Sequence, residues 1–465
     1  MSMKKTVIIS VLAAAVSTSA VGAVSAAPAA TASTQVTSST FYVNDALTTV
    51  RTIVKDGVTL VSVRDLGVAA GATFTVTGGK TVLAYLNDVL VELQDGSTTV
   101  RIGGEEGELG AAVVNVNNSF YAELEGFASA LGIEQTTDAS GKVWLDTTKR
   151  LADAEDPIWI DAQTLLVSTL AEDGSRVDYK VNAATGEFTE VFRTSTASTL
   201  TVAPNGAKAA YTDETGAVYV LDLATKSSAK VSSDDTIKPE LVWSADSSAI
   251  YFLQGDKGSV IAKLNPADGA ITKVLEDKVD YKADLAVSAD GKKFIYSVTK
   301  PGAVTADANK PVESDDVAID MTGTEPQLYV FDSSVKDGKP AKLTEKTDDK
   351  IFVGASADAG QAYYISSEEN KASSLIAVGT DKSVKSLLDG KDVIQATAAG
   401  DKLYALVATA TGGEVYEVQG GTSKLLYTVS EDVSEIVAGQ GTPVAVVEGG
   451  AILVDNGGKW KKVTK

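Results

Sequence analysis

The side chains of this chain that could do chemistry are mainly carboxylates and hydroxyls, because its 465 residues include no histidine and no cysteine. Without histidine the chain lacks the usual general base near neutral pH, the Ser-His-Asp triad and the commonest ligand of Zn and Cu. Without cysteine it has no disulfide, no thiol catalysis and no site for lipid attachment at an N-terminal cysteine. We therefore expect no cofactor and no metal centre, and we predict that the chain is not an enzyme.

Paired carboxylates are the one catalytic device that remains. The chain has 62 Asp and Glu residues, and glycoside hydrolysis needs only two of them at the right separation. No pair stands out, so a glycan-active enzyme is a distant alternative. The acidic clusters at 153–156 and 234–235 lack the EF-hand spacing, which leaves weak Ca²⁺ binding in a turn as an alternative. The string Gly354-Ala355-Ser356-Ala357-Asp358 lacks the last glycine of a nucleophile elbow.

A proline-containing acidic segment, Lys300 to Pro326, is the candidate for binding a partner. Loops of this length in compact folds are often functional or disordered, and both interpretations stay open. The acidic residues that would contact the partner are Asp307, Glu313, Asp315, Asp316 and Asp320.

The N-terminus and the net charge predict an exported, acidic protein. Lys4 and Lys5 precede an apolar stretch at 7–16 and a cleavage site at Val24-Ser25-Ala26, so residues 1–26 read as a signal peptide and 27–40 as a flexible spacer. No later segment is apolar enough to span a membrane, so we expect a secreted, extracellular protein that is not an integral membrane protein. The net charge of −21 disfavours nucleic acid and anionic lipid as partners.

A repeated phrase predicts the elements that position these side chains. It reads Ala-Pro-Asn-Gly at 203–206, Ser-Ala-Asp-Ser at 244–247, Ser-Ala-Asp-Gly at 288–291 and Ser-Ala-Asp-Ala at 356–359. A period of about 40–45 residues is typical of a β-propeller with four strands per blade. We predict about seven blades over 157–465, starting near 157, 200, 241, 285, 351, 393 and 434, after a linker at 149–156.

Two local features refine the propeller. The Asn205-Gly206 and Asp290-Gly291 pairs predict hairpin turns, because both central residues can take positive φ. Trp159, Trp243 and Trp460 could stack on sugars, but packing in the blade cores is favoured.

A second, smaller module covers 41–148 and carries an internal duplication at an offset of 61. Residues 56–61 correspond to 117–122, and Gly71 corresponds to Gly132. Each half predicts a turn, a short strand, a helix and a strand, with the glycine ending the helix. The chain as a whole is therefore expected to be mainly β, with a small α+β duplicated domain before the propeller.

These patterns resemble two known families. Residues 41–148, with Val61-Ser62-Val63-Arg64 and the helix-ending Gly71 and Gly132, resemble the copper amine oxidase N-terminal-like (stalk) domain of secreted Gram-positive proteins. The resemblance implies an appended extracellular module near the cell envelope, and not a copper site. The phrase Ser-Ala-Asp-Gly followed by Phe294-Ile295-Tyr296 resembles the repeat of TolB-like or WD-type propellers, which implies an interaction platform.

The sequence thus favours a non-catalytic extracellular binding protein whose propeller engages an unknown protein or envelope glycan. A structural protein of the cell surface or matrix is the alternative.

Overall fold

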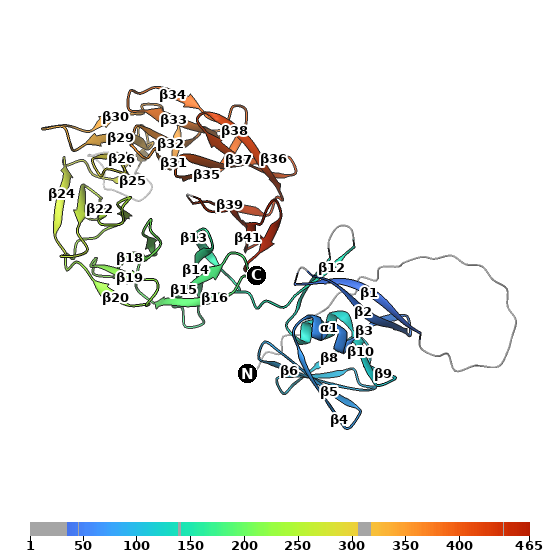
Figure 1. The fold of residues 1–465 in the computed structure, drawn as a ribbon. Coiled ribbons are helices and arrows are strands. Elements are labelled where there is room, and N and C mark those ends of the chain that lie inside the picture. Colours follow the sequence, from blue (N-terminus) through green and yellow to red (C-terminus); the bar gives the residue numbers. More distant parts are fainter. Residues whose placement is uncertain (1–34, 45, 138–140, 306–317, 440) are drawn as a thin grey trace, which may run out of the picture. The chain divides into compact units, whose positions relative to one another are not determined.

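The computed structural model describes residues 35–44, 46–137, 141–305, 318–439 and 441–465. The chain divides into two compact units, residues 1–147 and 148–465 (Figure 1). The predicted signal peptide and most of the predicted spacer lie outside the described residues. The end of that spacer differs from the expectation, because strand β1 already begins at Val36 and pairs along its whole length with β2.

The duplication in unit 1 is confirmed residue by residue. Strand, helix and strand follow one another as β3 (Val58–Ser62), α1 (Val63–Ala69) and β4 (Thr73–Thr77), and again as β10 (Ser119–Glu123), α2 (Leu124–Ala130) and β11 (Glu134–Thr137). The first residues of each pair differ by 61 in number. The side chains of Ser62 and Glu123 cap the helix N-termini, and Gly71 and Gly132 follow the helices with φ of +87° and +70°.

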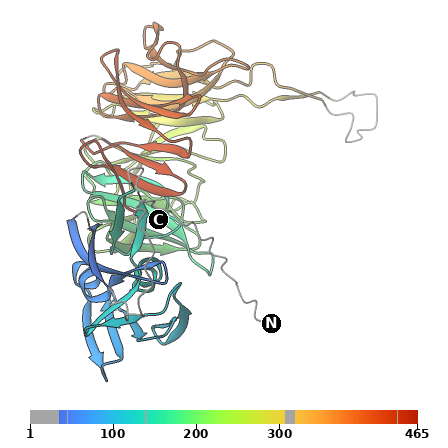
Figure 2. The same cartoon turned by 90° about the vertical axis from the view of Figure 1, so that its right-hand side faces the viewer.

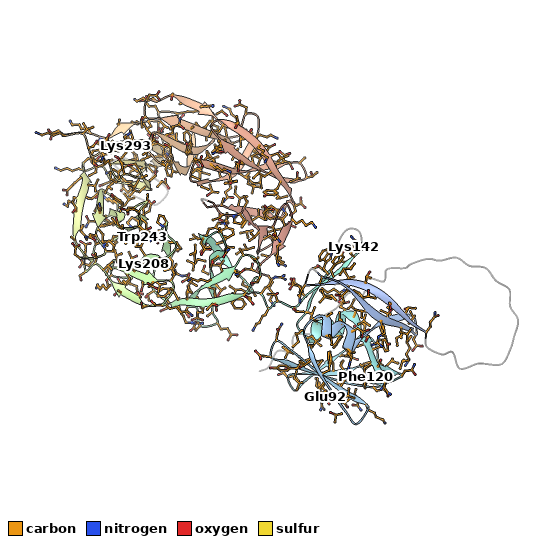
Figure 3. The ribbon with its side chains drawn as sticks, in the orientation of Figure 1. Glu92, Phe120, Lys142, Lys208, Trp243 and Lys293 are labelled. Atoms are coloured by element: carbon orange, nitrogen blue, oxygen red, sulfur yellow. The ribbon has the colours of Figure 1, made fainter. Side chains whose placement is uncertain are left out.

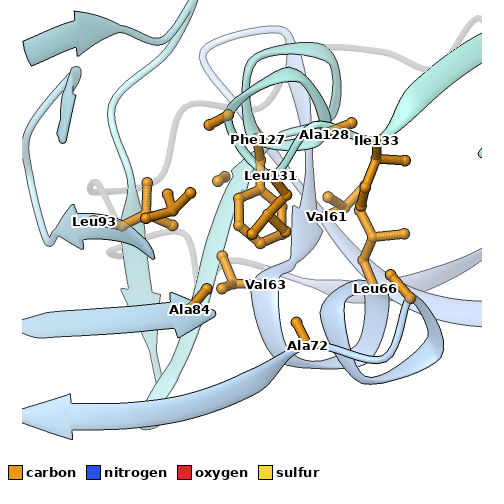
Figure 4. Packing of buried hydrophobic residues seen from close by; sticks show 14 of the residues in the cluster. Val61, Val63, Leu66, Ala72, Ala84, Leu93, Phe127, Ala128, Leu131 and Ile133 are labelled. Carbon is orange, nitrogen blue, oxygen red and sulfur yellow. The ribbon is translucent and has the colours of Figure 1, made fainter. Parts of the chain in front are cut away.

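Two sheets enclose the core of unit 1. One has the order β11-β12-β1-β2-β3-β10-β9 and the other β4-β5-β6-β7-β8. Phe127, Leu131 and Leu66 are almost completely buried in the core, where side chains of both helices and both sheets meet (Figure 4). The strands not yet given are β1 (Val36–Val43), β2 (Ala46–Lys55), β5 (Thr81–Leu86), β6 (Val89–Gln94), β7 (Thr99–Ile102), β8 (Glu105–Glu108), β9 (Val114–Val116) and β12 (Val143–Asp146).

Unit 2 is a propeller, and its described residues form seven four-stranded sheets. Blades 1 to 3 are β13 (Glu155–Asp161), β14 (Thr164–Leu170), β15 (Arg176–Asn182), β16 (Phe188–Thr194); β17 (Thr201–Val202), β18 (Lys208–Thr212), β19 (Val218–Asp222), β20 (Ser228–Lys230); and β21 (Leu241–Trp243), β22 (Ile250–Gln254), β23 (Val260–Leu264), β24 (Ile271–Glu276).

Blades 4 to 7 are β25 (Lys282–Val287), β26 (Lys293–Val298), β29 (Gln327–Asp332), β30 (Ala341–Lys342); β31 (Asp349–Ala355), β32 (Gln361–Ser367), β33 (Ser374–Gly379), β34 (Val384–Ser386); β35 (Asp392–Ala399), β36 (Lys402–Thr409), β37 (Gly412–Gln419), β38 (Thr422–Val429); and β39 (Val433–Val437), β40 (Ala445–Glu448), β41 (Ala451–Asp455), β42 (Trp460–Lys462). The predicted mainly-β fold is confirmed. A separate hairpin of β27 (Ala303–Thr305) and β28 (Ala318–Asp320) interrupts blade 4 and projects from the propeller (Figure 2).

The blades are held together by apolar side chains on both faces of each sheet. A hydrophobic cluster lies between every pair of consecutive blades in the described part of the ring, including one that joins blade 7 to blade 1. In the cluster between blades 3 and 4, Tyr251 and Leu253 pack against Phe294 and Tyr296. A sheet sandwiched between two neighbours must be apolar on both sides, which explains why these strands do not alternate between apolar and polar residues.

The ring closes without a shared strand, since each blade takes its four strands in sequence order. Leu151 forms a parallel bridge with Thr464, and the Lys465 N–H donates to the Leu151 carbonyl at 2.9 Å. The structure thus differs from the linker expected at 149–156. Leu151 and Ala154 are buried between blades 7 and 1, because their apolar side chains complete that cluster.

The recurring Ser-x-Asp phrase forms the turn between the first and second strand of a blade. The Ser288 hydroxyl donates to the Asp290 carboxylate at 2.6 Å and accepts from the N–H groups of Lys292 and Lys293. The predicted hairpins are confirmed, since β17 pairs antiparallel with β18 and β25 pairs antiparallel with β26. In the Asn205-Gly206 and Asp290-Gly291 pairs only the glycine takes positive φ, because the Asn or Asp side chain instead bonds the backbone two residues on.

Candidate functional site

The connections between blades and the loops between second and third strands lie on one face of the propeller, which we call the crossover face. This follows from the antiparallel order of the four strands in each blade. The Tyr281 N–H bonds the Lys257 carbonyl at 2.6 Å, and the Gly255 N–H bonds the Ile237 carbonyl at 2.8 Å. These bonds link the connections between blades to the loops between the second and third strands on this face.

Three buried lysines fix the chain where it enters blades 3, 4 and 5. The side chains of Lys238, Lys282 and Lys350 are all 0% exposed. Each ammonium group bonds backbone carbonyls and one aspartate. Lys238 contacts the Gly216, Asp234 and Thr236 carbonyls at 2.8–3.0 Å and the Asp234 carboxylate at 2.8 Å.

The other two cages follow the same plan. Lys282 donates to the Ser259 and Val279 carbonyls and to the Asp277 carboxylate at 2.7 Å. Lys350 donates to the Lys346 and Asp348 carbonyls and lies 2.6 Å from the Asp348 carboxylate. The buried charges are therefore paired and hydrogen-bonded, as burial requires. Burial and the nearby Asp348 raise the pKa of Tyr364 to about 12, so this phenol stays neutral beside the third cage.

The sequence carried a signal for these cages that was missed. Lys238, Lys282 and Lys350 each precede the aspartate of the Ser-x-Asp phrase by eight residues. A lysine in constant register with a turn motif indicates a repeated structural contact.

Carboxylates gather at one level of the first strands, close to the crossover face. The register of the first two strands in each blade makes one position equivalent across blades. It is occupied by Asp156, Glu240, Asp284, Gln395 and Glu435 in blades 1, 3, 4, 6 and 7. Four of these five side chains are carboxylic acids, so this level of the first strands is rich in acidic groups.

Two of these side chains reach the first strand of the next blade. Both carboxylate oxygens of Glu240 accept from the Leu285 N–H, at 3.0 and 3.1 Å. Gln395 accepts from the Ile436 N–H at 2.5 Å and donates to the Ile436 carbonyl at 3.1 Å. Burial and the neighbouring Asp284 raise the pKa of Glu240 to about 7, although the bond from Leu285 opposes the shift.

At the junction of blades 7 and 1, the equivalent side chain is Glu435, and the first strand of blade 1 offers it no backbone N–H at the matching position. Pro157 stands where Leu285 and Ile436 stand in their blades, and proline has no N–H. Burial and the charge of Asp156 raise the pKa of Glu435. Burial also raises the pKa of Asp178, against the pull of Arg176 at 3.1 Å. This junction therefore concentrates carboxylates that are poorly compensated.

Exposed apolar side chains also lie on the first strands and on the connections between blades. Ile351 and Ile394, near the start of the first strands of blades 5 and 6, are 54% and 51% exposed. Ile237 and Tyr281 are exposed on the connections into blades 3 and 4. The crossover face thus combines acidic groups with exposed apolar side chains.

Of the predicted partner-binding residues, Asp307, Glu313, Asp315 and Asp316 lie outside the described residues. Asp320 ends β28 and is exposed, and its carboxylate accepts from the Thr322 N–H at 2.9 Å. The structure does not bring Asp320 together with the carboxylates of the first strands.

The other sequence candidates have structural roles. Asp234 is paired with Lys238, and the Ser356 hydroxyl donates to Asp358 at 2.7 Å within a turn. Trp159 and Trp243 are buried in the blade cores, and Trp243 donates to the Thr201 carbonyl at 2.9 Å (Figure 3). Trp460 packs on Tyr427 with ring centroids 4.7 Å apart.

Among the described residues, no group of three or more acidic side chains is placed to hold a metal ion. Weak Ca²⁺ binding therefore stays a prediction without an identified site. An open pocket of 440 Å³ on the outer edge of blades 2 and 3 is lined by Lys230, Asp234 and Asp268, among others. No helix in the described ranges is long and apolar enough to cross a bilayer.

Comparison with known families identifies the first unit. Residues 42–144 match the family model of the copper amine oxidase N-terminal domain, which confirms the resemblance for this part of the chain. No protein of curated function matches the chain.

Solved structures resemble the propeller at low identity. An acylaminoacyl peptidase of Pyrococcus horikoshii is 15% identical with a TM-score of 0.47, covering 68% of this chain and 53% of its own. The propeller domain of the Trilobed protease from Pyrococcus furiosus is 16% identical with a TM-score of 0.46, and the match covers 69% of this chain and 97% of that domain. A putative TolB from Agrobacterium tumefaciens is 18% identical with a TM-score of 0.38, and the match covers 56% of this chain and 91% of the TolB chain.

These matches correct one prediction. The chain spans about half the length of the acylaminoacyl peptidase and matches only its propeller portion. The prediction that this chain is not an enzyme is therefore wrong. Similar propellers occur in peptidases, so an enzymatic function stays open.

Proposed function

We propose that the protein acts outside the cell as a binding protein, and that the crossover face of its propeller takes a polypeptide segment carrying basic and apolar side chains. One observation carries the proposal: Glu240, Asp284, Glu435 and Asp156 occupy equivalent positions on the first strands of four blades, and the first strands of blades 5 and 6 expose Ile351 and Ile394. Cationic groups would meet the carboxylates, and apolar groups would cover the isoleucines. The basic N-terminal stretch and the copper amine oxidase N-terminal domain support a place at the cell envelope.

The charge of the whole chain supports the choice of partner. A net charge of −21 attracts cationic partners from a distance and speeds their association. A glycan without charge could donate hydrogen bonds from its hydroxyl groups to the carboxylates, but it would gain neither ion pairs nor long-range attraction. A polypeptide therefore fits this face better than a neutral envelope glycan, which the same experiment also tests.

The test uses the full secreted chain on an array of peptides that vary in basic and apolar content, beside an array of envelope glycans. We expect binding to basic peptides that contain an apolar residue, and binding that weakens with salt. The variant D156N/E240Q/D284N/E435Q should lose it. Asparagine is suitable at 156 and 284 because both positions have positive φ.

A matched control neutralises four acids on the opposite face, E187Q, D268N, D337N and D401N, and should bind like the wild type. Equal loss in both variants would show a non-specific charge effect, and binding to glycans alone would contradict the proposal.

One observation favours the second candidate, a structural surface protein that assembles with itself. Edge strand β4 has the sequence Thr-Phe-Thr-Val-Thr with no charge, and in the described structure it pairs only with β5. The opposite edge strand, β8, carries three glutamates. Charged edges resist strand addition, and uncharged ones permit it. Self-association that the V76K variant abolishes would support this candidate.

A further inference from the structure

Two side chains at equivalent positions join consecutive first strands, and they differ in one donor group. Gln395 of blade 6 forms a two-bond contact with the Ile436 backbone, accepting from its N–H and donating to its carbonyl. Glu240 of blade 3 accepts from the N–H of the equivalent residue, Leu285, and from the Asp284 backbone, and in the described structure it forms no bond with the Leu285 carbonyl. Glutamate can copy the second bond of glutamine only when it is protonated, because an ionised carboxylate has no donor.

The surroundings of Glu240 favour the protonated form. From β25, Asp284 adds a like charge, and Lys282 is tied to Asp277. On the approach to β21, Lys238 is tied to Asp234. The nearest buried lysines are thus already neutralised by their own aspartates. Burial of the carboxyl adds a desolvation cost to the ionised form.

The strand that Glu240 holds is irregular at the point of contact. The register of β25 against β26 shifts between Ala283 and Ala286, and Asp284 has a φ of +57°. Leu285 lies within this bulge, so its backbone groups depend on contacts outside the regular ladder. A contact from the next blade is therefore well placed to order this segment.

We propose that Glu240 is a proton-operated brace between blades 3 and 4: protonated, it bonds both the N–H and the carbonyl of Leu285, as Gln395 bonds Ile436, and ionised, it keeps the N–H alone. Loss of the proton would loosen the start of β25 at the crossover face, whereas the Gln395 brace between blades 6 and 7 would not respond to pH. The inference concerns the fold of the propeller and does not depend on the proposed partner.

The experiment is amide hydrogen exchange of the full chain followed by mass spectrometry between pH 6 and pH 8, corrected for the intrinsic rates. Peptides covering 282–287 report on the Glu240 brace, and peptides covering 433–437 report on the Gln395 brace in the same molecule. In the wild type we expect protection of 282–287 to fall about tenfold relative to 433–437 as the pH rises. E240Q should abolish this difference.

The reciprocal variant Q395E tests whether the pH response comes from the glutamate itself or from the segment around it. Q395E should transfer the pH response to 433–437 while leaving it at 282–287. Equal pH behaviour of the two segments in the wild type would overturn the proposal. So would a response at 282–287 that persists in E240Q, since another group would then be titrating.

Discussion

The indole N–H of Trp159 donates a hydrogen bond to the Val437 carbonyl at 3.3 Å, joining the first blade to the last. Because no strand is shared between these blades, the closure depends on this bond, on the apolar cluster around it and on the backbone contacts of Leu151 with Thr464 and Lys465. W159F keeps most of the ring volume and removes the donor. We expect it to lower the stability of the propeller by about 1 kcal/mol and its Tm by about 2 °C, measured by calorimetry.

The control is W243F, which removes a similar bond to the Thr201 carbonyl between blades 2 and 3. If closure is a weak point, W159F should also increase proteolysis near the C-terminus, and W243F should not. Identical proteolysis of the two variants would contradict a special role for the closure.

The buried Lys282 gives a larger effect. K282M leaves the Asp277 carboxylate and the Ser259 carbonyl without their cation, and we expect a loss of about 3–5 kcal/mol in urea unfolding. K282M/D277N should recover part of this loss, because it removes the stranded charge. K273M removes an exposed pair with Glu276 and should stay within about 0.5 kcal/mol of the wild type. A similar cost for K282M and K273M would mean that the cage does not hold the chain.

Glu240 predicts how stability depends on pH. Its pKa is raised from 4.5 to about 7, so the folded protein binds this proton more tightly than the unfolded chain does. Protonated Glu240 therefore stabilises the folded protein fully below pH 4.5, and this stabilisation is lost as the pH rises to about 7. Between pH 4.5 and about 7, the free energy of unfolding of the wild type should therefore fall by about 3 kcal/mol relative to that of E240Q. Urea unfolding of both proteins at successive pH values measures this difference. D284N should move the midpoint to lower pH, because it removes a like charge.

Ser288 tests the recurring turn. Its hydroxyl is buried and bonds the Asp290 carboxylate and two backbone N–H groups. S288A should cost about 1–2 kcal/mol in thermal unfolding, because the N–H groups lose their acceptor. S356A, at the more accessible turn of blade 5, should cost less, since water can replace its hydroxyl. The reverse order would contradict a buried role for the phrase.

Gly67 tests the packing of unit 1. A Cβ at this position in α1 would lie 2.2 Å from Cζ of Phe74. G67A should therefore force Phe74 to move and cost about 1–3 kcal/mol in the unfolding of unit 1. G67A/F74L should recover part of the loss. An unchanged stability in G67A would show that Phe74 moves freely.

The elements that repeat along the chain could be predicted from the sequence, and those made by distant residues could not. The Ser-x-Asp turns and Gly71 with Gly132 are local signals, so they revealed the blades and the duplicated helices. The place of Leu151 could not be predicted, because its partner Thr464 lies at the other end of the propeller. A charged segment before a repeat array looks like a linker until that partner is known.

The candidate site was harder to predict for a similar reason. Glu240, Asp284 and Glu435 are three acids among 62. Glu240 and Asp284 both precede the serine of a Ser-x-Asp phrase by four residues, but Glu435 precedes a turn without that phrase. The acidic segment at 300–326 drew attention because it is rich in acids, whereas the anionic level of the first strands is assembled from single residues of separate blades.

Since each blade takes all four of its strands from one stretch of the chain, every repeat is a complete building block. A gene rearrangement that gains or drops one such block would leave no strand without partners, so the ring could change size through evolution in whole steps. During synthesis each blade can likewise finish before the next begins, and only the last joint has to wait for Lys465.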